Sequence, residues 1–180
     1  PRIVAAPENR VLLTRGDRAY ARGLSSTPLK QRVAGRSEDF RVFRDAKPLR
    51  DPTTNAVLGY EAKYLGKAAL VRSEGMQAGE SSFGRSTEAV IPATIDITSA
   101  KEEMRVGDRL LPEPPRQFQS YVPHAPGGPM TGTIVSVYGD AVSFAGQNQV
   151  VVINKGTADG IENGHVLAIL KTGARVDDRS

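Results

Sequence analysis

The stretch that decides the fold runs from Val57 to Arg72 and has the sequence VLGYEAKYLGKAALVR. Its Tyr, Leu, Ala and Val content would suit a strand or a helix, but Gly59 and Gly66 interrupt it. Glycine in a helix interior costs about 1 kcal/mol relative to alanine, which argues against a helix. Glycine inside a strand often marks a bulge. We therefore predict a long or bent strand with Gly66 at a bulge.

Shorter strands are predicted on both sides of this stretch, because apolar residues alternate with polar ones or follow turn-forming residues. The cluster from Asp51 to Asn55, just before the stretch, consists of turn formers. The predicted strands comprise two within Val11–Ala21 around Gly16-Asp17, then Phe40–Phe43, Ala89–Thr98, Ile134–Tyr138 and Ala141–Phe144 around Gly139-Asp140, Gln149–Asn154 and Val166–Leu170.

Between these strands we expect loops and little helix. Leu24–Asp39 and the Gly/Ser/Glu-rich segment Ser73–Ser86 are predicted loops, and Ala100–Val106 is a predicted helical turn capped by Ser99. The chain has Gly 18 and Pro 12 among its 180 residues, a density that favours many turns. The predicted fold class is all-β, with small barrel- or sandwich-like domains built of short strands.

The domain organisation follows from the proline clusters. We expect a β-rich N-terminal domain over residues 1–112, a Pro/Gly-rich linker over 113–130 and a small C-terminal β domain over 131–180. A weak internal repeat relates Ile95–Leu111 to Val151–Leu167, with Val11–Asp17 as a more distant copy. Duplication and independent use of the same corner both remain open explanations.

Composition bounds the function. The formal net charge of +4 is spread over the chain without a basic block, so we expect no nucleic-acid partner. Cys 0 excludes disulfides and thiolate chemistry, and it fits the cytosol as well as periplasmic proteins without thiols. No apolar run approaches the ~20 residues of a transmembrane helix. The opening residues lack Met and a signal peptide, so we expect a fragment of a longer protein.

No catalytic, cofactor-binding or metal-binding residues are predicted. The chain has two histidines, His124 in a Pro/Gly loop and His165 after Gly164. A zinc site needs three or four ligands, and no spacing motif supplies them. We therefore expect His124→Ala and His165→Ala to leave function intact. The Arg15-Gly16-Asp17 tripeptide is interpreted as a turn rather than an integrin ligand.

Two kinds of functional site remain possible: a tyrosine surface that binds a ligand, and a catalytic pair of carboxylates. Tyr60 and Tyr64 form a candidate glycan or partner surface, because tyrosine combines an apolar face with a polar tip. An enzyme would need two carboxylates facing each other, about 5–10 Å apart in glycan hydrolases. Nothing singles out such a pair among its possible members, Asp39, Asp45, Asp51, Glu61, Asp96 and Glu103.

Four stretches carry a resemblance to a known family. They are Phe40–Arg44, Asp51–Glu61, Tyr64–Gly66 and Glu102–Pro112, and together they are similar to the C-terminal region of proteobacterial LysM-containing, peptidoglycan-associated envelope proteins. In that family a signal peptide and a LysM module come first. No LysM-like segment is visible in this chain, which lacks the Gly-Asp-Thr-Leu helix start.

The resemblance implies a non-catalytic binding or scaffold region of a bacterial envelope protein, located in the periplasm or cell envelope. Peptidoglycan would be bound through the LysM module that this chain lacks, and other envelope proteins are the alternative partners. No cofactor is expected. A cell-wall glycan hydrolase with an unrecognised carboxylate site is the alternative function, and a subunit-contact module that pairs through exposed β edges is a third.

Overall fold

A computed structural model describes residues 1–31, 38–79, 87–115, 120–139, 147–170 and 173. Strands dominate these residues, and their only helical elements are two single 3-10 turns, η1 (Pro7–Asn9) and η2 (Thr157–Asp159). The all-β prediction is therefore confirmed. The predicted helical turn over Ala100–Val106 is wrong, because Met104 instead forms an antiparallel bridge with Leu13.

Contacts divide the chain into two compact units. The first consists of Pro1–Pro48 and Gly59–Arg116, and the second of Leu49–Leu58 and Gln117–Ser180. The second unit is thus discontinuous in sequence. It includes the turn of Asp51–Asn55, where Asn55 N donates to Asp51 O at 2.8 Å, as the turn-forming residues there predict.

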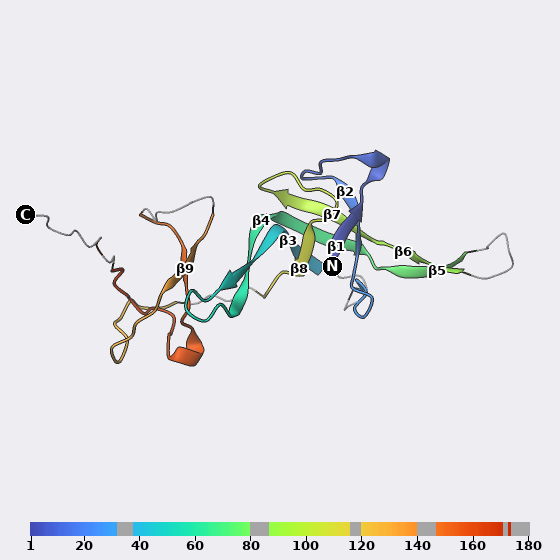
Figure 1. Cartoon of the computed structure of the whole chain (residues 1–180). Coiled ribbons are helices and arrows are strands. Elements are labelled where there is room, and N and C mark those ends of the chain that lie inside the picture. Colours follow the sequence, from blue (N-terminus) through green and yellow to red (C-terminus); the bar gives the residue numbers. More distant parts are fainter. Residues whose placement is uncertain (32–37, 80–86, 116–119, 140–146, 171–172, 174–180) are drawn as a thin grey trace, which may run out of the picture. The chain divides into compact units, whose positions relative to one another are not determined.

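The first unit is built on a closed, antiparallel barrel (Figure 1). Hydrogen-bonded neighbours follow the order β1-β2-β7-β4-β3-β8, and β8 pairs with β1 to close the cylinder. Closure gives each barrel strand a hydrogen-bonded neighbour on both sides along at least part of its length. The strands are β1 (Arg2–Ala5), β2 (Arg18–Arg22), β3 (Glu38–Arg50), β4 (Val57–Arg72), β7 (Ala93–Ala100) and β8 (Arg109–Pro112).

Four further strands form two separate two-stranded sheets. β5 (Gly75–Gly79) pairs with β6 (Thr87–Ile91), and β9 (Ile134–Val137) pairs with β10 (Val151–Ile153). β5 lies inside the predicted loop Ser73–Ser86, so that prediction is wrong for residues 75–79, while 80–86 lie outside the described residues.

The missed strand has a physical explanation. β5 is held by its register with β6, in which Met76 lies opposite Val90, and Met76 keeps 71% of its surface exposed. The sequence of β5 therefore lacks the apolar pattern that indicates a buried strand. The strand predicted at Val166–Leu170 is also absent, and the one at Ala141–Phe144 lies outside the described residues.

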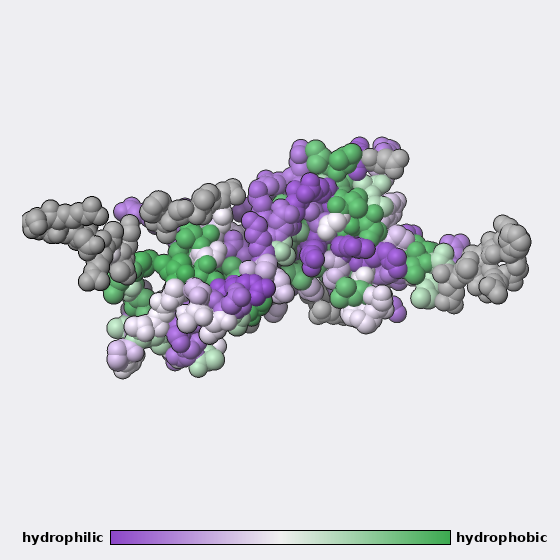
Figure 2. Space-filling model, viewed as in Figure 1, coloured by the Kyte–Doolittle hydropathy of each residue, from purple (hydrophilic) through white to green (hydrophobic). Residues whose placement is uncertain are grey.

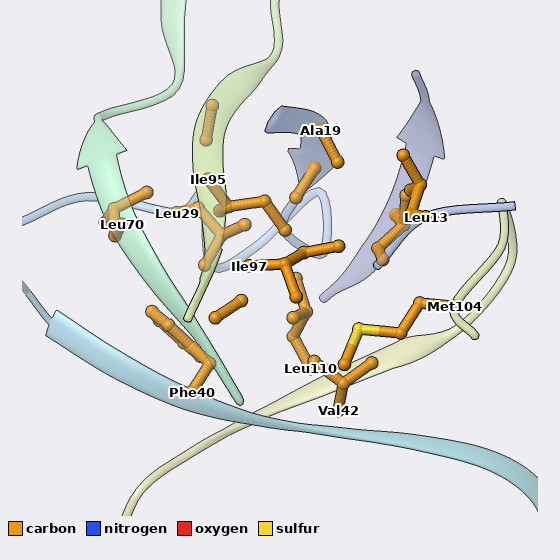
Figure 3. Packing of buried hydrophobic residues seen from close by; sticks show 14 of the residues in the cluster. Leu13, Ala19, Leu29, Phe40, Val42, Leu70, Ile95, Ile97, Met104 and Leu110 are labelled. Atoms are coloured by element: carbon orange, nitrogen blue, oxygen red, sulfur yellow. The ribbon is translucent and has the colours of Figure 1, made fainter. Parts of the chain in front are cut away.

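The barrel interior is filled with apolar side chains (Figure 3). Every barrel strand contributes inward-facing residues, and three buried apolar residues come from the connecting segments: Leu13, Leu29 and Met104. A six-stranded barrel is narrow enough for side chains to fill it completely. The buried apolar residues on the strands are Ile3, Ala19, Ala21, Phe40, Val42, Leu65, Ala68, Leu70, Ala93, Ile95, Ile97 and Leu110.

Gly66 lies where β4 approaches β7 most closely. Its φ of 154° is one that other residues rarely adopt, and an added Cβ would lie 2.1 Å from Ser99 O. The register between β4 and β7 shifts directly after Lys67, the residue that follows Gly66. The extra residue there is Thr98 of β7, because Lys67 lies opposite Ser99 and Ala68 opposite Ile97, while Gly66 itself pairs with Ala100. The predicted bulge at Gly66 is therefore wrong, and glycine is required by the positive φ and the close approach of the β7 backbone.

Two corners of the same geometry connect barrel strands. In the first corner, Asp17 N donates to Thr14 O at 3.1 Å, and the Asp17 carboxylate accepts from Thr14 N at 2.8 Å. In the second corner, Asp108 N donates to Arg105 O at 3.2 Å, and the Asp108 carboxylate accepts from Arg105 N at 2.8 Å. Each aspartate thus closes its own turn, as turn-forming aspartates commonly do.

Each corner also docks onto a barrel strand through its glycine. Gly16 and Gly107 have φ of 91° and 99°. Gly16 N donates to the carbonyl of Ile97 in β7, and Gly107 N donates to that of Ile3 in β1, both at 2.9 Å. The Gly-Asp pairs at these positions are therefore turns, and the copies of the predicted repeat at Val11–Asp17 and Ile95–Leu111 share one type of corner.

Substituting Gly66 tests the close approach of β4 and β7. We expect Gly66→Ala to lower the free energy of unfolding by at least about 2 kcal/mol, because the new Cβ meets backbone atoms that cannot move aside. Gly59→Ala, in the same strand with nothing within 4 Å of its Cβ position, is the control. It should change stability by less than about 1 kcal/mol. Urea denaturation measures both, and equal effects would contradict this account.

Substituting the corner aspartates tests their unequal burial. Asp108 accepts two hydrogen bonds from Arg44, both at 2.8 Å, and its side chain is 2% exposed. We expect Asp108→Ala to cost about 3 kcal/mol, since it leaves Arg44 without its buried partner. Asp17→Ala should cost about 1 kcal/mol, because Asp17 is more exposed and its partner Arg10 is solvated. Denaturation curves would refute this if both losses were the same.

Candidate functional site

A third corner, in the second unit, carries histidine where the first two carry aspartate. It spans Glu162 to His165, and His165 N donates to Glu162 O at 3.2 Å. The intervening Gly164 has a φ of 103°, close to the values of the corner glycines in the barrel. The copy of the repeat that ends at Leu167 therefore folds as the other corners do.

His165 closes this corner with its ring. Glu162 N donates to His165 Nδ1 at 3.2 Å, as Thr14 N and Arg105 N donate to aspartate oxygens in the other corners. A backbone N–H is only a donor, so Nδ1 must present its lone pair. In the neutral ring the proton then resides on Nε2.

His124 is attached to the corner through its backbone. His124 N donates to Gly164 O at 2.9 Å, and Val166 N donates to His124 O at 2.8 Å, which forms a parallel bridge between the two histidines. The His124 ring contacts the Val122 carbonyl through Nδ1 at 2.8 Å. Because a carbonyl oxygen only accepts, Nδ1 carries a proton, and in the neutral ring Nε2 then keeps its lone pair.

The two rings therefore hold opposite tautomers, and they lie edge to face. Their centroids are 4.9 Å apart with an interplanar angle of 75°. Glu162 completes the group, and one ligand atom from each of the three side chains lies within 4.8 Å of the other two. His124 and Glu162 are exposed and His165 is half-buried, so solvent reaches the group.

Sequence reasoning did not find this group. The spacing of Glu162 and His165 is visible in the sequence, but His124 comes from a distant segment. Only the hydrogen bonds of the parallel bridge bring the two together. Two imidazoles and a carboxylate are ligands that zinc accepts. The prediction that the chain holds no metal remains a prediction.

The structure places the predicted tyrosine surface in two different settings. Tyr60 is 71% exposed, with its ring available to a ligand. The Tyr64 ring is already in contact with Phe43, at a centroid distance of 5.6 Å, and with Lys101 Nζ, 5.5 Å from its centroid. Residues four apart in a strand lie about 13 Å from each other on one face, so the pair cannot sandwich a single sugar ring.

Two of the possible catalytic carboxylates have structural partners. Hydrogen bonds from the Thr54 backbone, the Asn154 side chain and the Thr53 backbone lower the pKa of Asp51. The hydrogen bonds from Arg18, at 2.7 and 3.0 Å, lower the pKa of Asp96. A general acid at neutral pH needs the opposite shift. Neither residue is therefore suited to protonate a leaving group.

No helix among the described residues has the length and hydrophobicity to cross a membrane. No family model matches the sequence, and comparisons with characterised proteins and with solved structures found no significant similarity to any of them.

Proposed function

We propose that this chain is a non-catalytic binding or scaffold region of a bacterial cell-envelope protein related to the LysM-containing family. The observation that carries the proposal is the closed barrel, whose interior is filled by apolar side chains. A barrel filled in this way holds no ligand within it, so partners would be recognised on the outer surface and the hairpins.

The residues that resemble the family support the proposal, because they lie at positions that build the fold. Phe40–Arg44 is part of β3, and Asp51–Glu61 contains the turn between β3 and β4. Tyr64–Gly66 includes the glycine packed against β7, and Glu102–Pro112 contains the second corner and β8. A protein that shares these residues would share the barrel.

The surface suits a partner other than a polyanion. Hydrophilic and hydrophobic residues are interspersed on the visible face of the first unit (Figure 2). With a net charge of +4, the chain offers a weak, salt-sensitive attraction to an anionic polymer. Peptidoglycan would then be bound through a LysM module, and this region would contact envelope proteins or position the module.

The glycan hydrolase is the weaker candidate. Its mechanism requires one carboxyl group with a raised pKa, and the shifts at Asp51 and Asp96 are in the opposite direction. These two residues also stabilise local structure, since Asp51 organises the turn between β3 and β4 and Asp96 joins β7 to β2 through Arg18. Their positions are explained without catalysis.

A sedimentation assay with purified peptidoglycan sacculi tests the proposal. At about 0.15 M salt, where charges are screened beyond about 8 Å, we expect the chain alone to stay in the supernatant. The same chain fused behind a LysM module should sediment, which shows that the assay detects binding. Salt-resistant sedimentation of the chain alone would overturn the proposal.

If the chain alone sediments, two tyrosine variants locate the glycan site. Tyr60→Ala removes the exposed ring of β4, and Tyr121→Ala is the matched control, because Tyr121 is also exposed, at 61% against 71% for Tyr60. Loss of sedimentation for Tyr60→Ala alone would assign glycan binding to the tyrosine surface. Aromatic rings commonly provide such contacts without relying on charge.

A further inference from the structure

We propose that His124, Glu162 and His165 bind a divalent transition-metal ion of the zinc type, and that His165 exchanges its corner-closing hydrogen bond for the bond to the metal. The three ligand atoms already lie within 4.8 Å of one another. Ligands of a tetrahedral zinc ion are about 3.4 Å apart, given bonds of about 2.1 Å. A small movement of the exposed side chains completes the site.

The donor set selects the class of metal. Two imidazole nitrogens and one carboxylate oxygen suit zinc and its neighbours, whereas magnesium and calcium favour oxygen ligands. The chain has no cysteine, so thiolate does not compete for the ion. Three protein ligands leave the fourth position of a tetrahedral ion open to water or to a group from a partner.

His124 is already oriented as a ligand. Its Nδ1–H donates to the Val122 carbonyl at 2.8 Å, which leaves the Nε2 lone pair free. Metal-binding histidines usually donate their second N–H to a carbonyl or carboxylate in this way, because that bond fixes the ring and its tautomer. No rearrangement of tautomer is needed at this residue.

Gly164 allows the His124 ring to lie against the corner. A Cβ at this position would lie 2.8 Å from Val122 O and 3.1 Å from both Cε1 and Nδ1 of His124. Any larger residue would therefore push the ring away from the carbonyl that orients it. Glycine at this position therefore both allows the positive φ of the corner and leaves room for the His124 ring.

His165 has to give up a hydrogen bond. If the metal binds Nδ1, it takes the lone pair that accepts the Glu162 N–H. If the metal binds Nε2, the proton moves to Nδ1, which then cannot accept. By either route, metal binding opens the hydrogen bond between Glu162 N and His165, and it leaves the backbone bond from His165 N to Glu162 O available.

The alternative is that His165 only closes the corner, as aspartate does at positions 17 and 108. Calorimetric titration of the full chain, without an affinity tag, with Zn²⁺ separates the two. We expect one ion per chain, no binding of Mg²⁺, and visible absorption bands when Co²⁺ replaces Zn²⁺. Absence of Zn²⁺ binding up to millimolar concentration would overturn the proposal.

Three variants assign the ligands. We expect weaker Zn²⁺ binding, by at least about tenfold, in each of three variants: His124→Ala, Glu162→Gln and His165→Asn. Even residues that only hydrogen-bond to a metal ligand typically cost about tenfold in metal affinity when they are replaced. Asparagine at position 165 can still accept the Glu162 N–H, so this variant keeps the corner closed. Asp159→Asn is the matched control, because Asp159 is an acidic residue of the same segment outside the group, paired with Lys155.

Nuclear magnetic resonance of the imidazole nitrogens provides a readout that a structural role would not move. Without metal, His124 should be protonated on Nδ1 and His165 on Nε2. With Zn²⁺, the Glu162 amide proton should shift upfield as it loses its acceptor, and the His124 Nδ1–H should remain. If Zn²⁺ binds and the Glu162 amide signal does not change, the exchange of hydrogen bond for metal bond at His165 is contradicted. If His165→Asn binds Zn²⁺ as tightly as the unaltered chain, His165 is not a ligand.

Discussion

The barrel depends on a pair of backbone hydrogen bonds between two residues far apart in the sequence. Leu13 N donates to Met104 O and Met104 N donates to Leu13 O, both at 2.8 Å. This bridge joins the two aspartate corners. The first corner is also hydrogen-bonded to β7, the strand that precedes the second corner, and the second corner is hydrogen-bonded to β1, the strand that precedes the first. Both side chains are fully buried. The bridge therefore satisfies the backbone groups that join the two corners and places two side chains in the apolar core at the same point.

The same corner recurs in the second unit with a different acceptor. A carboxylate oxygen and an imidazole nitrogen can both receive the N–H of the residue three positions earlier, so the backbone tolerates either. The chemistry that follows is not equivalent. A carboxylate has a second oxygen free for a cation, as the Arg44 contact of Asp108 shows, whereas imidazole has one lone pair when neutral. One geometry thus supports an ion pair in the barrel and a half-buried imidazole ring in the second unit.

The parts of this structure that sequence patterns could predict are those decided locally. Alternating apolar residues indicated β2, β3, β4 and β7, and glycine with aspartate indicated the corners. The strand β1 was missed, and the strand predicted before Gly16 is only a single bridge at Leu13. The strand β5 escaped because pairing rather than side-chain burial holds it. The His124 group escaped because a bridge between distant segments creates it, and no spacing along the chain records such a bridge. Tyr64 was chosen for its aromatic ring, but the ring is in use against Phe43.

The second unit consists of two segments that are far apart in the sequence, and this affects how it folds during synthesis on the ribosome. Leu49–Leu58 leaves the exit tunnel long before Gln117–Ser180, the rest of its unit. The hydrogen bond from Asn154 Nδ2 to Asp51 Oδ2, at 3.0 Å, joins residues separated by 103 positions. Such distant contacts slow folding, because a long loop must close first. The hairpin end must therefore wait for the rest of its unit until Gln117–Ser180 has been synthesised.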